Sequence, residues 1–137
     1  STAVIEFDLK GHVLKANQQF FDAMGYSFER IKGKHHSLFC YPSESNTPEY
    51  VQFWERLNRG EFVAGRFRRV DSHGREIWLE ASYLPVRDAQ GQVSKVIKLA
   101  ADITERGTNC SAGMSNSKAN STKPTEAITA QPDRAPA

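Results

Sequence analysis

Aromatic residues occupy only one part of this 137-residue chain. All eight Phe, four Tyr and two Trp residues precede Arg106, and none follows it. The last 31 residues contain eight Ser or Thr, three Pro and a single Ile, so they cannot bury enough apolar surface to offset the entropy of ordering. We therefore expect one folded domain over residues 1–106 and a disordered polar tail or linker over residues 107–137.

Charge, hydropathy and cysteine spacing exclude several classes of protein. The formal net charge is only +2, which provides no basic surface for nucleic acid. No apolar run is long enough to cross a bilayer, and the N-terminus lacks the basic-then-apolar pattern of a signal peptide. The sequence thus predicts a cytoplasmic protein without direct membrane insertion. Cys40 and Cys110 have the spacing of neither a zinc site nor a disulfide framework.

The sequence also lacks the motifs of an enzyme. It contains no nucleophile elbow, no glycine-rich phosphate loop and no His-Glu-x-x-His helix, and its carboxylates are spread along the chain. Arg66, Arg68 and Arg69 form a small basic cluster on one predicted strand. An exposed sheet face explains this cluster, and a phosphate contact would need more positive charge nearby. We expect a domain that is not catalytic.

The apolar pattern has a period of two at both ends of the predicted domain, which is typical of half-buried strands. Residues 3–9 and 12–14 form two predicted strands that Lys10 and Gly11 join in a tight turn. Three further predicted strands, which form an antiparallel meander, cover residues 62–70, 76–86 and 93–104.

Helical signals fill the segment between the two groups of strands. Asn17 can cap a short helix that ends at Gly25, and two further helical turns are expected over residues 27–33 and 35–39. A longer amphipathic helix is expected over residues 47–60, where Thr, Pro and Glu begin the segment. The predicted fold is α+β, a five-stranded antiparallel sheet with short helices and one longer helix on one face.

Short motifs in a fixed order carry a resemblance to a known family. They are residues 8–11 (DLKG), 16–20 (ANQQF), 24–26 (MGY), 29–36 (ERIKGKHH), 53–57 (FWERL), 60–62 (GEF), 69–78 (RVDSHGREIW), 81–86 (ASYLPV) and 102–104 (DIT). Their order and spacing resemble the PAS domains of bacterial chemotaxis receptors, in particular those like the aerotaxis receptor. The resemblance implies a sensory module that binds a cofactor or small ligand in an interior cleft and relays the change to a neighbouring output domain.

The resemblance also implies association with a second copy. The PAS fold forms homodimers through its sheet and N-terminal flank, and in a parent protein it adjoins a downstream signalling domain. The alternative from another class is a ligand-free PAS module, filled by its own side chains, that serves dimerisation only. Asp102 and Thr104 are the expected relay residues, because the family couples its sheet to a following helix through this motif. A strand end with a polar stop explains the same residues.

Two adjacent histidines are the first candidates for contact with a ligand. The resemblance places His35 and His36 beside the interior cleft, and His36 would be the axial metal ligand if haem is bound. The segment over residues 47–60 contains no histidine, so only this pair can supply that ligand. The structural alternative is one exposed histidine and one that lies in the core or is hydrogen-bonded.

Trp54 and Asn17 complete the candidate cofactor-binding residues. Trp54 matches an aromatic residue of the FAD-binding group and would stack on a flavin, or else belong to the core. Asn17 is either a helix cap or a ligand-facing amide. Residues 40–43 (CYPS) keep only the proline of that group's Arg-His-Pro-Asp run, and the reactive cysteine of light-oxygen-voltage domains is replaced by His36. Haem, FAD, a small metabolite and no ligand all stay open.

Overall fold

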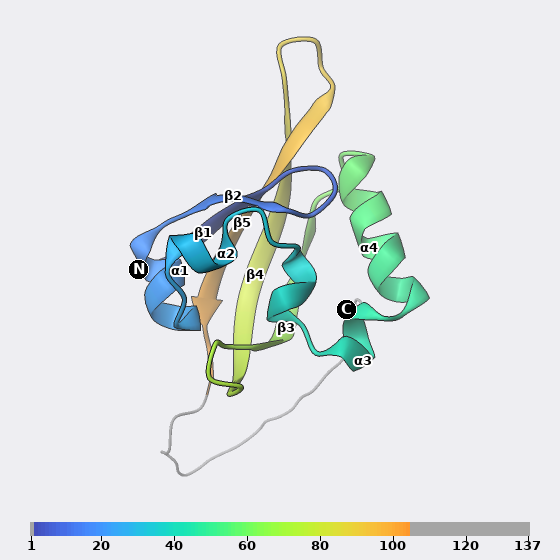
Figure 1. Ribbon diagram of the computed structural model, residues 1–137. Helices are drawn as coiled ribbons and strands as arrows, with labels where there is room; N and C mark the ends of the chain where they lie inside the picture. Colours follow the sequence, from blue (N-terminus) through green and yellow to red (C-terminus); the bar gives the residue numbers. More distant parts are fainter. Residues whose placement is uncertain (1, 105–137) are drawn as a thin grey trace.

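The computed structural model describes residues 2–104 of the chain (Figure 1). The predicted boundary at Arg106 and the predicted tail over residues 107–137 lie outside the described residues, so both stay predictions.

Five antiparallel strands form one sheet in the order β2-β1-β5-β4-β3. The last strand, β5, lies at the centre of the sheet. It pairs with the first strand, β1, for example through Ala3 and Ala100, so the two ends of the domain lie side by side. Strands β3, β4 and β5 form the predicted meander. The strands are β1 (Ala3–Phe7), β2 (Val13–Ala16), β3 (Val63–Val70), β4 (Glu76–Arg87) and β5 (Val93–Asp102).

The helices cover one face of this sheet, as Figure 1 shows. They are α1 (Gln18–Met24), α2 (Phe28–Ile31), the 3-10 helix η1 (His36–Phe39), α3 (Pro42–Ser45) and α4 (Pro48–Asn58). The predicted fold class is therefore confirmed. Helix α3 was not predicted, because its one turn begins at Pro42 without a side-chain cap and carries no apolar stripe.

Strands β1, β2 and β5 differ most from their predicted ends. Strand β1 stops at Phe7 because Asp8 begins a turn, in which its Oδ1 accepts hydrogen bonds from the backbone N–H groups of Lys10 and His12. Strand β2 runs over residues 13–16 rather than 12–14. Strand β5 ends at Asp102, two residues early, because Thr104 turns its hydroxyl back to the backbone of β4.

The hydrophobic core fills the space between the helices and the inner face of the sheet. Side chains of β4 alternate as predicted, and Ile77, Leu79, Ala81 and Tyr83 are all buried. Aromatic residues from the helical segment complete the core; they include Phe20, Phe39, Phe53 and Trp54. These aromatic residues therefore meet in one layer, which also holds the candidate site.

Gly11 offers a first test of this packing. Its φ of +88° lies in the left-handed region, and a Cβ there would lie 2.9 Å from His35 Nε2 and 3.2 Å from the Trp54 ring. We expect Gly11→Ala to lower the free energy of unfolding by more than the roughly 1–2 kcal/mol of the backbone conformation alone. Gly91→Ala is the control, since Gly91 has a similar φ of +81° and open space around it. Equal losses in urea unfolding would contradict close packing at Gly11.

Candidate functional site

A group of polar side chains lies inside the otherwise apolar core. His36, Arg69 and Lys98 are buried there, with exposed fractions of 0%, 5% and 1%. They come from η1, β3 and β5 and meet around the buried ring of Tyr83 on β4. Tyr50 of α4 and Cys40 complete the group, which we name the His36 cluster; its members are His36, Cys40, Tyr50, Arg69, Tyr83 and Lys98.

His36 occupies the centre of the cluster because both ring nitrogens have partners. Nδ1 lies 2.7 Å from the hydroxyl of Tyr50, and Nε2 lies 2.9 Å from the hydroxyl of Tyr83. A neutral imidazole has one donor and one acceptor, so one hydroxyl donates to the ring and the other accepts from it. Burial, followed by the charges of Arg69 and Lys98, holds the His36 pKa well below its usual value. The imidazole is therefore neutral at pH 7.

The cationic side of the cluster lies on the sheet. Arg69 donates from Nη2 to the Tyr83 hydroxyl at 3.1 Å and from Nη1 to the Arg68 carbonyl at 2.9 Å. Lys98 pairs with Tyr83 across the strands, and its Nζ lies 5.0 Å from the centre of the Tyr83 ring. Burial and the nearby guanidinium lower the Lys98 pKa well below its usual value.

Two buried N–H groups of this region have no hydrogen-bond partner among the described residues. They are Nε of Arg69 and Nε1 of Trp54. Both residues contact the centre of the cluster, because Arg69 shares the Tyr83 hydroxyl with His36 and the Trp54 ring lies 5.5 Å from the His36 ring. An unsatisfied buried donor is costly and uncommon, so this site has unused capacity to bind an acceptor.

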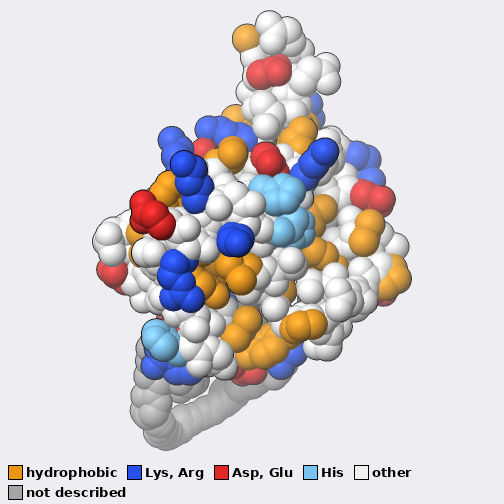
Figure 2. Space-filling model, viewed as in Figure 1, with side chains coloured by type: hydrophobic (Ala, Val, Ile, Leu, Met, Phe, Trp, Pro, Cys, Tyr) orange, Lys and Arg blue, Asp and Glu red, His pale blue; other side chains and the backbone are white. Residues whose placement is uncertain are grey.

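The two predicted histidines occupy different positions. His36 is buried and hydrogen-bonded, as the structural alternative proposed, whereas His35 is half-buried rather than exposed. The His35 Nδ1 accepts a hydrogen bond from the Ser37 N–H at 3.1 Å, and its ring lies 5.4 Å from that of His12. Histidine side chains gather at this surface in Figure 2 (pale blue). The outer edge of the site therefore consists of the His12 and His35 imidazoles. Its interior consists of the side chains of the His36 cluster.

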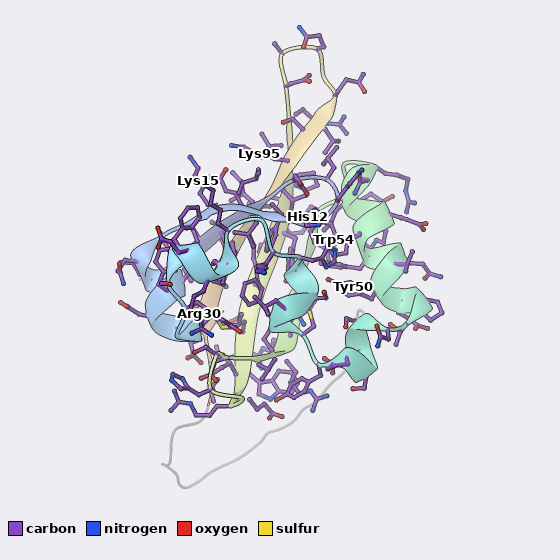
Figure 3. The ribbon with its side chains drawn as sticks, viewed as in Figure 1. His12, Lys15, Arg30, Tyr50, Trp54 and Lys95 are labelled. Atoms are coloured by element: carbon purple, nitrogen blue, oxygen red, sulfur yellow. The ribbon has the colours of Figure 1, made fainter. Side chains whose placement is uncertain are left out.

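Trp54 belongs to the core. It is 8% exposed, and its ring contacts Phe7 and Phe53 at 5.7 Å in perpendicular arrangements. Trp54 and Tyr50 project from one side of α4, with Trp54 beside His12 of the β1–β2 turn (Figure 3). This helix therefore supplies one wall of the cluster.

Asn17 is the cap of α1. Its Oδ1 accepts from the Phe20 N–H at 3.0 Å and from the Val4 N–H at 2.9 Å, and its Nδ2 donates to the Thr2 carbonyl. None of these partners belongs to the His36 cluster. The amide therefore joins α1 to strand β1, and its role toward a ligand stays a prediction.

Asn17 accepts hydrogen bonds from both α1 and β1, so removing its amide should lower the stability of the domain. We expect Asn17→Ala to lower the free energy of unfolding by about 1–2 kcal/mol, because one change leaves two backbone N–H groups without their acceptor. Gln18→Ala is the control, since Gln18 is exposed on the same helix and bonds only Asp22 across one turn. A loss equal to that of the control in chemical denaturation would contradict the capping role.

The predicted relay residues lie where β5 ends against the start of β4. The Thr104 Oγ1 accepts from the Trp78 N–H at 2.8 Å, and the Thr104 N–H donates to Asp102 Oδ1 at 2.8 Å. The Ile103 N–H donates to the Trp78 carbonyl at 2.9 Å. The motif therefore fastens the end of the domain to the strand that also carries Tyr83.

His36 does not fit an axial haem ligand, and Trp54 does not fit a stacked flavin. An axial ligand needs a free ring nitrogen, and both nitrogens of His36 are hydrogen-bonded. Within residues 2–104 no group of three His, Cys, Asp or Glu side chains could hold a metal ion. The Trp54 ring is packed among protein rings and offers no open face to a flavin.

The sequence interpretation missed the cationic members of the cluster. It explained the cluster of Arg66, Arg68 and Arg69 by an exposed sheet face, and this does not hold for Arg69, which lies on the core face with Phe67. Lys98 likewise lies on the buried face of β5, between Val96 and Ala100. The alternation of side chains along a strand could have predicted this burial, because it places Arg69 and Lys98 at inward-facing positions.

Comparisons with known proteins agree with this fold. The family model described as "PAS fold" matches residues 1–108. The Pseudomonas aeruginosa biofilm dispersion protein BdlA is 50% identical over 106 residues, covering 77% of this chain and 25% of that protein. The Escherichia coli aerotaxis receptor is 22% identical over 105 residues, covering 77% of this chain and 20% of the receptor. This chain thus spans a quarter or less of these relatives.

Solved structures show the same fold at low identity. A PAS domain from Colwellia psychrerythraea superposes with a TM-score of 0.66 at 24% identity, covering 77% of this chain and 88% of that one. A light-oxygen-voltage domain, in a structure described as a flavin analogue study, gives a TM-score of 0.66 at 18% identity, covering 77% and 79%. In the part of the chain that the structure describes, no helix is long and apolar enough to span a membrane.

Proposed function

The chain belongs to the PAS family, and from this premise we propose that it is a chemotaxis-type sensory module whose His36 cluster binds a small ligand. Ligand binding would change the packing between helices and sheet, and an adjoining domain would read that change. Two relatives, BdlA and the aerotaxis receptor, support the chemotaxis-type context.

The observation that carries the proposal is the buried polar cluster itself. A module that only dimerises gains stability from an apolar core, and charged groups in that core cost free energy unless something pairs with them. Here two cations, an imidazole and two phenols converge from one helix, one 3-10 helix and three strands. Convergent polar groups inside an apolar surround are typical of ligand sites.

The same strands connect the cluster to the end of the domain. Tyr83 lies on β4, and the start of that strand holds Thr104 through Trp78. A ligand that favours one position of the Tyr83 side chain and its strand would bias the contact at Thr104 by its differential affinity for the two states. We propose Asp102 and Thr104 as the relay to the adjoining domain.

Exposed apolar residues favour a second role in self-association. Leu14 of β2 and Leu99 of β5 are 45% and 37% exposed, and Leu99 lies on the outer face of the sheet because its neighbours Lys98 and Ala100 point into the core. We propose a homodimer through this face, which leaves the His36 cluster free to bind its ligand. Sedimentation of wild type against Leu99→Ser tests this proposal, with a shift toward monomer as the expected result and an unchanged dimer as the contradiction.

Absorbance and mass spectrometry of the purified chain test the ligand proposal. We expect a released small molecule and a spectrum without a Soret band or flavin bands, because His36 has no free ring nitrogen for haem and Trp54 has no open face for a flavin. His36→Phe should release less of that molecule, whereas His73→Gln, a change at an exposed turn, should not. A colourless protein that releases no molecule would contradict ligand binding and favour the dimerisation module.

A further inference from the structure

The buried charges of this domain do not balance. Arg69 and Lys98 are both buried in the core, on the strands that flank β4. Asp71 is the single buried acid of residues 2–104, and it is held in its own turn by Arg75 Nε at 3.0 Å and by the backbone N–H groups of His73 and Arg75. No buried carboxylate of the described residues therefore pairs with Arg69 or Lys98.

The remaining members of the cluster cannot supply the missing negative charge. Burial raises the pKa of Tyr83 to about 12 and also raises the pKa values of Tyr50 and Cys40. All three side chains are therefore neutral at pH 7. His36 can only be neutral or positive, so the cluster as a whole has a positive charge without an internal counter-ion.

Unused hydrogen-bond donors point to the same kind of partner. Arg69 Nε and Trp54 Nε1 are buried without an acceptor among the described residues. Arg69 uses its two terminal nitrogens for Tyr83 and Arg68, so Nε is the guanidinium nitrogen without a partner. A group with several acceptor oxygens and a negative charge would satisfy these donors, balance the charge of Arg69 and favour the protonated form of Lys98.

We propose that the ligand of the His36 cluster carries an anionic group, a carboxylate or a phosphate, which Arg69 and Lys98 bind. The inference rests on the proposed function and specifies the chemistry of its ligand. Arg69 Nε and Trp54 Nε1 donate to the oxygens of this group, and the Tyr50 and Tyr83 hydroxyls adjust their donor and acceptor roles to the remainder of the ligand. Tyr50 and His35 are half-buried, so they form the part of the cluster nearest to solvent.

Two substitutions test the charge requirement in the 137-residue chain. Arg69→Gln removes the guanidinium, and Lys98→Met removes the ammonium while keeping the length of the side chain. Arg66→Gln is the matched control, because it removes the same charge from an exposed position on the same strand. Circular dichroism confirms folding of each variant. We expect ligand-free Lys98→Met to melt at or above the temperature of wild type, since it replaces a buried amino group without a carboxylate partner by an apolar side chain.

Binding is measured with two defined probes, succinate and inorganic phosphate, against chloride at equal ionic strength. We expect at least one probe to raise the melting temperatures of wild type and Arg66→Gln in a saturable way. The same probe should bind Arg69→Gln and Lys98→Met with an affinity about tenfold lower, or lower still. Stabilisation by succinate identifies a carboxylate ligand, and stabilisation by phosphate identifies a phosphate ligand. Stabilisation that persists in both cluster variants would overturn the proposal.

Mass spectrometry of the molecule released from wild type separates this inference from the proposed function. A released carboxylate or phosphate supports both. A neutral or cationic molecule overturns the anionic ligand and leaves the sensory function in place. If no molecule is released and neither probe acts beyond chloride, both proposals fail.

Discussion

Replacing Phe53 by alanine is expected to lower the free energy of unfolding by about 3–5 kcal/mol. Phe53 is 7% exposed, and its ring lies 4.8 Å from the Tyr83 ring, 6.0 Å from the His36 ring and 6.3 Å from the Phe67 ring. The change removes the contacts between α4 and the sheet at the point where the cluster lies. The whole free energy of unfolding of a domain of this size is about 5–15 kcal/mol, so this loss is a large fraction of it.

Val51→Ala is the control for this prediction, because Val51 lies on the same helix and is 56% exposed. We expect it to change the free energy of unfolding by about 0.5 kcal/mol or less. Urea unfolding followed by circular dichroism measures both variants. A loss below about 1 kcal/mol for Phe53→Ala would mean that α4 does not pack on the sheet as described.

The arrangement of strands and of α4 could be predicted from local patterns. Period-two alternation between Phe62 and Asp102 reflects a sheet with one buried face, so the pattern and the fold have the same cause. The apolar stripe of α4 likewise predicted its buried side, since Phe53, Trp54 and Leu57 are all buried. Capping of α1 by Asn17 was predictable because it depends on residues three positions apart.

The connections inside the site depend on long-range packing and have no local signal. His36 is bonded to Tyr50 and Tyr83, which lie 14 and 47 positions away along the chain. An arginine or lysine on a strand is exposed in most proteins, so the inward positions that alternation gives Arg69 and Lys98 were not recognised. Their inward positions become meaningful only when the register of β3, β4 and β5 is known.

Acidification should weaken the fold through His36. In the unfolded chain a histidine takes up a proton near pH 6.5, whereas the pKa of folded His36 is well below that value because of burial. Between these two pKa values the unfolded state binds more protons, so stability falls as pH falls below about 6.5. The fall attributable to one such group is at most about 1.4 kcal/mol per pH unit, or about 2 kcal/mol between pH 6.5 and 5.

The variant His36→Gln isolates this contribution. Cations on β3 and β5 (Arg69 and Lys98) and neutral groups on α4, β4 and the end of η1 (Tyr50, Tyr83 and Cys40) face the ring, and all of them are kept. We expect the stability of His36→Gln, measured by urea unfolding from pH 5 to 7, to depend less steeply on pH than that of wild type, while exposed His73→Gln follows wild type. Carboxylates do not account for the difference, since their unfolded pKa values lie near 4. Equal slopes in wild type and His36→Gln would show that folded His36 takes up a proton as readily as a histidine in water. That result would also remove the neutral imidazole on which the hydrogen bonds to both tyrosines depend.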